Sequence, residues 1–134
     1  MDPDDLAGSL GAEHVIAGAG GGLRLRGGRC ASCGALAFPK PGICTSCLSE
    51  DIADVPLAGD GALYAFSVIH VGGRRGRLPY ALGYVDLSDG VRVFTELTRT
   101  DGLRPDMAVA IAITPEASAP EIRYRFAADP VEAA

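Results

Sequence analysis

All four cysteines of this 134-residue chain lie in one short stretch, CASCGALAFPKPGICTSC, which runs from Cys30 to Cys47. They form two Cys-x-x-Cys pairs, Cys30 with Cys33 and Cys44 with Cys47, and ten residues separate the pairs. A Cys-x-x-Cys turn places two thiolates on one side of an ion, so two turns can close a tetrahedral site. The spacing therefore predicts a structural metal site. Zinc is the first choice, iron can occupy the same geometry, and a redox-active dithiol or two disulfides are the remaining alternatives.

The segment around these cysteines has few large apolar side chains with which to build a core. Residues 25–52 contain six of them, namely Leu25, Leu36, Phe38, Ile43, Leu48 and Ile52. Ordering a chain costs roughly 1–2 kcal/mol per residue, whereas zinc contributes about 10–16 kcal/mol to zinc-finger peptides. Four sulfur ligands leave no open coordination position for a water molecule. We therefore expect the metal to hold this segment together and to take no part in chemistry.

The rest of the chain has the pattern of short β-strands. Five segments are rich in β-branched and aromatic residues or alternate between apolar and polar side chains, at residues 61–71, 80–87, 91–97, 107–114 and 121–127. The Ser-Asp-Gly sequence at Ser88–Gly90 is typical of a tight hairpin turn. No amphipathic stretch of helical length lies among them, so we expect a small barrel, whose closure removes exposed edges. A five-stranded OB-fold barrel fits best, and an SH3-like barrel is the rival.

These features divide the chain into three parts and predict a mainly β fold. A weakly helical or flexible lead occupies residues 1–22, a rubredoxin-like zinc ribbon occupies residues 23–54, and the OB-fold barrel occupies residues 55–134. The glycine-rich segment Gly18–Gly28 contains no phosphate-binding glycine motif. We interpret it as a flexible connection to the ribbon, which begins with a short strand.

Charge and hydropathy limit the partners and the location of the protein. The net charge is −5, and residues 1–54 carry seven acids and four bases while residues 55–134 carry ten and eight. Nucleic-acid binding depends on neutralising phosphates, so this balance argues against a nucleic-acid partner. No apolar run approaches the roughly 20 residues that span a bilayer, and the acidic N-terminus lacks a secretory signal. We expect a cytoplasmic protein with no membrane partner, in which cysteines stay reduced.

The sequence offers no convincing catalytic set. His14 lies in the weakly structured lead, and His70 lies at the end of the first barrel strand, where contact with a ligand is the alternative to a structural role. There is no Gly-x-Ser-x-Gly motif. Asp86 and Asp89 flank a hairpin turn, and turn chemistry explains both. We expect no catalytic residue and no enzymatic activity of the chain on its own.

Aromatic and apolar side chains suggest where the chain is packed and where it meets a partner. We expect alternation to place most of the barrel aromatics in the core, although OB-folds can also stack bases on such residues; they are Tyr64, Phe66, Tyr80, Tyr84, Phe94, Tyr124 and Phe126. The ribbon tip around Leu36, Phe38 and Ile43 is more apolar than a solvated hairpin requires. It is therefore the candidate surface for a protein partner.

The order of lead, four-cysteine ribbon and five-stranded barrel resembles the acyl-CoA-associated zinc-ribbon and OB-fold family, long catalogued as a domain of unknown function. The matching pieces cover roughly residues 23–129 and are LRGGRCASCGALAFPKPGICTSCLSE, PLAGDGALYAFSVIHV, LPYALGYVDLSDGVRVFTELT, LRPDMAVAIAITP and YRFAAD. The chain departs from the family at Gly18–Gly22, which stands where a more robust helical lead is expected. Any partner contact made through that segment is therefore in doubt.

The resemblance implies a function. Such a chain is expected to be a non-catalytic accessory or scaffold subunit that forms a hetero-oligomer with a thiolase-like enzyme, a thiolase-like aldolase or an acyltransferase. The complex would use acyl-CoA substrates, and the loop GGRRGRLP, with Arg74, Arg75 and Arg77, would then contact coenzyme A phosphates, because arginine forks suit phosphate oxygens. A solvated loop explains these arginines equally well. The alternative function is a free-standing nucleic-acid-binding module.

Overall fold

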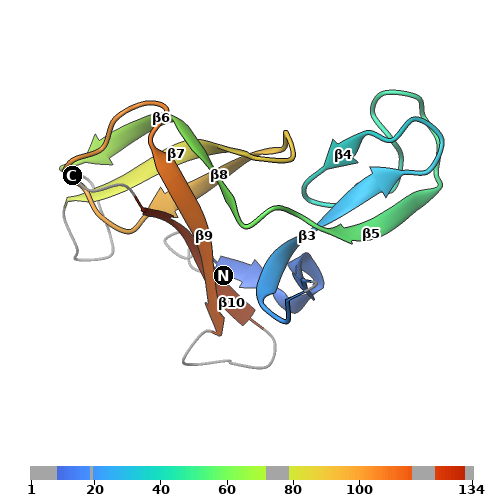
Figure 1. Ribbon diagram of the computed structural model, residues 1–134, viewed down its shortest axis with the longest axis horizontal. Helices are drawn as coiled ribbons and strands as arrows, with labels where there is room; N and C mark the ends of the chain where they lie inside the picture. The colour runs from blue at the N-terminus through green and yellow to red at the C-terminus, as the bar shows by residue number, and fades with distance from the viewer. Residues whose placement is uncertain (1–8, 19, 72–78, 116–122, 132–134) are drawn as a thin grey trace.

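Two β-sheets make up the chain in this computed structural model (Figure 1). The structure describes residues 9–18, 20–71, 79–115 and 123–131. The barrel lies at the left of Figure 1 and the ribbon, with strands β3, β4 and β5, lies at the right. Among the described residues no helix is long and apolar enough to cross a membrane.

The first sheet is the expected five-stranded barrel with one extra strand. Its strands are β1 (Ser9–Gly11), β6 (Asp60–Ile69), β7 (Tyr80–Leu87), β8 (Arg92–Leu97), β9 (Ala108–Pro115) and β10 (Arg123–Pro130). They follow the order β1-β10-β8-β7-β6-β9, and β9 also pairs with β10, which closes the sheet. The β10–β8 pairing is parallel and the other pairings are antiparallel. The prediction of a mainly β fold with an OB-type barrel is confirmed.

The second sheet forms the ribbon around one central strand. Strand β3 (Leu23–Cys30) pairs with β2 (Val15–Ala17), β4 (Leu36–Ala37) and β5 (Ile52–Pro56), in each case antiparallel. The last residue of β3 is Cys30, so the central strand runs directly into the cysteine pair. The ribbon is therefore built on the same strand that delivers its first sulfur.

The N-terminal lead differs from the weak helix or flexible segment that its sequence suggested. Its described part consists of β1, a single 3-10 turn η2 (Ala12–His14) and β2. Strand β1 pairs with β10 of the barrel and β2 pairs with β3 of the ribbon. Glycines weaken a helix here, whereas each short strand satisfies its backbone groups on a neighbouring sheet edge. The lead thus links the two sheets.

The two sheets share one hydrophobic core. Leu25 of the ribbon and Leu57 of the connection are buried in the same cluster as the barrel residues Leu63, Met107 and Val109. Strand β3 can approach this cluster because residue 27 is glycine: a Cβ there would lie 2.5 Å from Leu57 Cδ2. The division into lead, ribbon and barrel therefore stays a prediction. Its test is whether the ribbon can unfold while the barrel, which it contacts, stays folded.

Most of the barrel core is aliphatic rather than aromatic. Met107 and Val109 are fully buried, with Ile111 and Ile113 packed against the core from the same strand, as their alternation indicated. The expectation that most aromatics fill the core is wrong for three of them, because Tyr64, Tyr84 and Phe94 are 52%, 46% and 49% exposed. Small side chains such as Ala81, Val85 and Val93 occupy the inner positions of their strands instead.

The start of β6 depends on a close backbone approach. A Cβ at Gly61 would overlap the carbonyl oxygen of Asp86 and lie 2.8 Å from Leu87 Cα, both on the paired strand β7. These neighbours are backbone atoms, so they cannot rotate away. Glycine is the residue that allows β6 and β7 to pair here while β6 also pairs with β9.

We predict that Gly61→Ala lowers the free energy of unfolding by about 2–3 kcal/mol, because the added methyl group forces two paired strands apart. The matched control is Gly42→Ala in the ribbon, since a Cβ at Gly42 meets nothing within 4 Å. We expect that control to change stability by no more than about 0.5 kcal/mol. Denaturant unfolding followed by circular dichroism measures the free energy of unfolding of both variants. Equal effects of the two substitutions would show that the close backbone approach at Gly61 does not determine stability.

Candidate metal centre

Two turns of the same geometry present the four cysteines. In the first turn the N–H of Gly34 donates to the carbonyl of Cys30 (2.8 Å), and in the second the N–H of Leu48 donates to the carbonyl of Cys44 (2.9 Å). The fifth residue of each turn has a positive φ angle, 80° at Gly34 and 65° at Leu48. This repeat brings the second thiol of each pair back beside the first.

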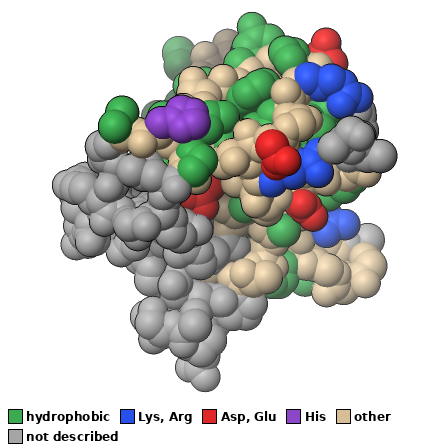
Figure 2. Space-filling model, turned by 90° about the vertical axis from the view of Figure 1, so that its left-hand side faces the viewer, with side chains coloured by type: hydrophobic (Ala, Val, Ile, Leu, Met, Phe, Trp, Pro, Cys, Tyr) green, Lys and Arg blue, Asp and Glu red, His purple; other side chains and the backbone are tan. Residues whose placement is uncertain are grey.

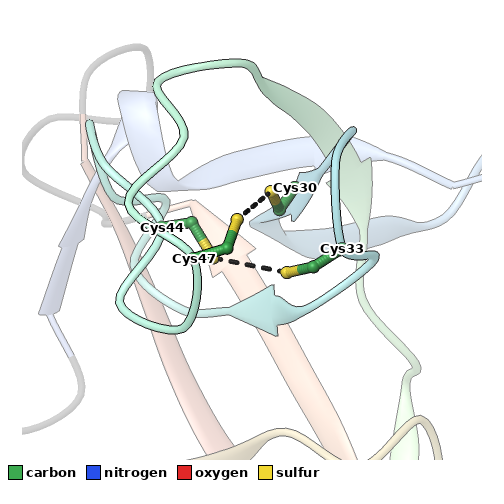
Figure 3. A group of neighbouring side chains, drawn as sticks. All are labelled: Cys30, Cys33, Cys44 and Cys47. Carbon is green, nitrogen blue, oxygen red and sulfur yellow. Dashed lines mark hydrogen bonds between the residues drawn. The ribbon is translucent and has the colours of Figure 1, made fainter.

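The sulfur atoms of the four cysteines face one another (Figure 3), and all lie within 4.8 Å of each other. The Cys30 and Cys47 sulfurs are 3.4 Å apart, and those of Cys33 and Cys44 are 3.6 Å apart. A tetrahedral zinc ion with bonds of about 2.3 Å requires sulfur–sulfur distances of about 3.8 Å. A disulfide requires about 2.05 Å. The cluster therefore fits a four-thiolate metal site and contains no disulfide.

The backbone prepares the inner thiols for ionisation. Cys30 and Cys44 are buried, whereas Cys33 and Cys47 are exposed. A backbone hydrogen bond from Cys33 lowers the pKa of the Cys30 thiol to about 6, although burial opposes this. A backbone hydrogen bond from Cys47 is likewise the main reason that the pKa of Cys44 is lowered.

The outer thiols show why the cluster needs a cation. A backbone hydrogen bond from Ser49 favours the thiolate of Cys47, but the neighbouring Cys30 sulfur and burial raise the pKa of Cys47 to about 12. The pKa of Cys33 is also raised: a backbone hydrogen bond from Ala35 lowers it, but the contacts with Cys44 and Cys30 and burial together outweigh that bond. Thiolates this close repel one another, so only a positive ion allows all four to ionise together. Four sulfur ligands close the coordination shell, and the site can stabilise the fold but has no position for an activated water.

The other residues singled out from the sequence lie away from the cysteines or outside the described residues. The His14 ring contacts Phe38 edge-on, with centroids 6.1 Å apart, and its Nε2 lies 3.5 Å from the Glu13 carboxylate. His70 is exposed just after β6. The loop arginines Arg74, Arg75 and Arg77 fall outside the described residues.

The two hairpin aspartates have structural partners. The Asp89 carboxylate accepts hydrogen bonds from the backbone N–H of Ala58 (2.9 Å) and of Val91 (3.5 Å), as turn chemistry suggested. Asp86 instead accepts two hydrogen bonds from Arg92, at 2.6 and 3.1 Å. This pairing lowers the pKa of Asp86, chiefly through the hydrogen bond. Both carboxylates therefore have structural roles in the barrel.

The apolar ribbon tip is smaller than the sequence suggested. Leu36 and Phe38 are half-buried and pack against the common core, while Ile43 is 50% exposed. The neighbouring exposed apolar residue on the ribbon is Leu48, at 76%. Leu36 and Phe38 are thus packed against the common cluster rather than forming a free tip.

The sequence interpretation missed an exposed aromatic group on the barrel, formed by Tyr64, Tyr84 and Phe94. The signal was present in the alternation of β8, where Phe94 shares its face with Arg92 and Glu96. Two charged neighbours in phase with an aromatic residue indicate the outer face of a half-buried strand. The same phase places Tyr84 with Asp86 on β7.

Comparison with known proteins places both modules in one family. Residues 22–53 match the model described as the ChsH2 rubredoxin-like zinc ribbon domain, and residues 54–114 match the ChsH2 C-terminal OB-fold domain. The chain therefore belongs to the ChsH2-type family, in which a four-cysteine ribbon precedes an OB-fold. The predicted resemblance is confirmed.

Individual relatives agree with this family. The chain is 40% identical over 112 residues to the benzoylsuccinyl-CoA thiolase subunit BbsA of Geobacter metallireducens, covering 76% of that protein. It is 42% identical over 78 residues to BbsA of Thauera aromatica, of which it spans about half (54%). A DUF35 domain-containing scaffold protein of Methanocaldococcus jannaschii is 33% identical over 72 residues, which is 51% of its length.

A solved structure shows a similar fold. The chain described as the Ltp2-ChsH2(DUF35) aldolase matches with a TM-score of 0.69 and 29% sequence identity. The match covers 81% of this chain and 86% of the other. The ribbon-plus-barrel arrangement is thus shared with a protein from an aldolase assembly.

We predict that freshly purified protein carries one metal ion per chain on Cys30, Cys33, Cys44 and Cys47. Elemental analysis measures this, and a folded protein with less than about a tenth of an equivalent of metal would contradict it. Cys44→Ser should unfold residues 25–52 while the barrel strands keep their protection from hydrogen exchange. Loss of protection throughout would show that the ribbon and barrel are one cooperative unit.

The two turns also allow a matched pair of substitutions. Leu48 has φ 65°, in the left-handed region that costs a non-glycine residue about 1–2 kcal/mol. We expect Leu48→Gly to remove this strain and to increase resistance to metal loss in a chelator competition. Gly34→Ala introduces the same strain in the first turn and should decrease the resistance to metal loss. The opposite order of the two variants would contradict this interpretation.

Proposed function

We propose that this chain is a non-catalytic accessory subunit of a thiolase-like acyl-CoA enzyme complex, with an aldolase or an acyltransferase as the other possible partner enzymes. The observation that carries the proposal is the closed cluster of four sulfurs, which can stabilise a fold but cannot activate a substrate. The relatives support it, since two are described as thiolase subunits and one as a scaffold protein.

The proposal includes three finer statements. The metal is zinc, which the chemistry of four thiolates and the family description support. The chain works in the cytoplasm, where reduced cysteines bind metal. The complex acts on acyl-CoA, and contact between coenzyme A phosphates and Arg74, Arg75 and Arg77 stays a prediction from the sequence.

We predict that the pure chain has no thiolase, ligase or hydrolase activity on acyl-CoA substrates. Co-expressed with its cognate thiolase-like enzyme, it should elute in size-exclusion chromatography as a larger hetero-oligomer containing both polypeptides. Omission of the chain should reduce the partner's activity or stability. Separate elution of two stable proteins, or acyl-CoA turnover by the pure chain, would overturn the proposed function.

A further inference from the structure

The outer face of strands β6, β7 and β8 is unusually apolar for a sheet face in contact with water. An antiparallel sheet that packs on a core with one face usually presents polar residues on the other. Here the outer positions include Leu82 and Tyr84 on β7, Phe94 on β8, and Ala65 and Ile69 on β6. These side chains line a shallow groove of about 330 Å³.

The register of the strands makes this a continuous surface. Tyr84 lies opposite Ala65 on one side and opposite Phe94 on the other. The Tyr84 and Phe94 rings contact each other, with centroids 5.0 Å apart. Three of the seven large hydrophobic side chains recorded as exposed in the described part of the chain, Tyr64, Tyr84 and Phe94, belong to these three strands. The others are scattered over the ribbon, a loop and the end of β10.

One end of this face carries a charged group that is already paired. Arg92 donates two hydrogen bonds to Asp86, and its guanidinium carbon lies 3.6 Å from the centre of the Tyr64 ring. Tyr64 reaches this position from the irregularity in the β6–β7 pairing between Leu63 and Ala65. The aromatic face therefore ends in a fixed tyrosine–arginine–aspartate group.

The charges on this face select the chemistry of its partner. Arg92 is neutralised by Asp86, and the remaining charged residue of the outer row on β8 is Glu96. Figure 2 shows the barrel end of the molecule, where described Lys and Arg side chains lie beside Asp and Glu rather than forming a basic surface. Phosphates need unpaired cations, and the described residues of this face present none, so a nucleic acid or an anionic membrane fits this part of the surface poorly. Tyrosine, phenylalanine and arginine are instead enriched at the centres of protein–protein interfaces.

We propose that this aromatic face, centred on Tyr84 and Phe94, is the docking surface for an apolar patch on the thiolase-like partner enzyme. The occupant rests on the proposed function. A different polypeptide fits better than a second copy of this chain because the similar structure comes from an assembly described by two components. In the free chain Tyr64 and Tyr84 are 52% and 46% exposed, and the polar hydroxyl of a tyrosine makes such exposure less costly than that of a purely apolar side chain.

The test uses isothermal titration calorimetry to measure the affinity of the metal-loaded chain for its cognate thiolase-like enzyme. The double variant Tyr84→Ser with Phe94→Ser removes the two central rings. We expect binding to weaken at least about a hundredfold, as for the loss of central interface residues. The control is Val131→Ser, which removes a similarly exposed apolar side chain, 60% exposed, beyond the end of β10 and outside both the face and the ribbon tip. We expect the control to bind within about threefold of the unmodified chain.

A second measurement does not depend on the variants. Hydrogen exchange of the unmodified chain, alone and in the complex, should show new protection over Leu82–Tyr84 and Arg92–Glu96. Equal affinity of the double variant and the unmodified chain would overturn the docking surface and leave the proposed function intact. If the double variant is misfolded, exchange that is unchanged over these segments overturns it in the same way.

Other outcomes assign the face elsewhere. Failure of the unmodified chain to bind the enzyme would overturn the proposed function and this occupant together. Sedimentation velocity of the chain alone tests for a dimer, and fluorescence anisotropy with a poly-dT oligonucleotide tests for nucleic acid. Self-association or oligonucleotide binding that disappears in the double variant would overturn the proposal in favour of that occupant.

Discussion

The four clustered sulfur atoms constrain the whole chain through one strand, β3. Its last residue, Cys30, belongs to the cluster, its first residues pair with β2 and its second half with β4 and β5, and its Leu25 is buried in the common core. The ribbon has little core of its own, so an ion that holds the two cysteine turns together also fixes the end of β3. The same strand also contacts the barrel side of the molecule, because Leu25 is buried in the common core and Gly27 lies against Leu57. A metal used in this way supports assembly and has no need of an open coordination position.

Local rules in the sequence were sufficient for the ribbon and for most of the barrel. The Cys-x-x-Cys spacing identified the four clustered cysteines because such turns are short and their geometry is local. Alternation identified strands such as β9, where Met107 and Val109 face the core. The Ser88–Gly90 turn could be predicted because glycine readily adopts positive φ angles, and Gly90 indeed has a φ angle of 96°. In each case the residues that determine the structure are neighbours along the chain.

The features that escaped prediction depend on contacts between distant segments. Strand β1 forms because β10, at the other end of the chain, offers it an edge, and no local propensity indicates this, whereas β2 pairs with β3 across the short turn between them. Phe38 is half-buried against the common cluster and beside the His14 ring of the lead, whereas its sequence context suggested an exposed tip. Alternation was expected to place most barrel aromatics in the core, and this is wrong for Tyr84 and Phe94, because the phase of Asp86, Arg92 and Glu96 marks the outer face.

The central claim is that the metal is structural and that the chain serves a partner enzyme. Exchange of the bound ion for cadmium, which also binds four thiolates, tests it most directly when acyl-CoA turnover of the assembled complex is measured. The account predicts that kcat stays within about twofold, since the closed site does not touch the reaction. A change in kcat of about tenfold or more with the identity of the ion, in a complex of unchanged composition, would contradict it.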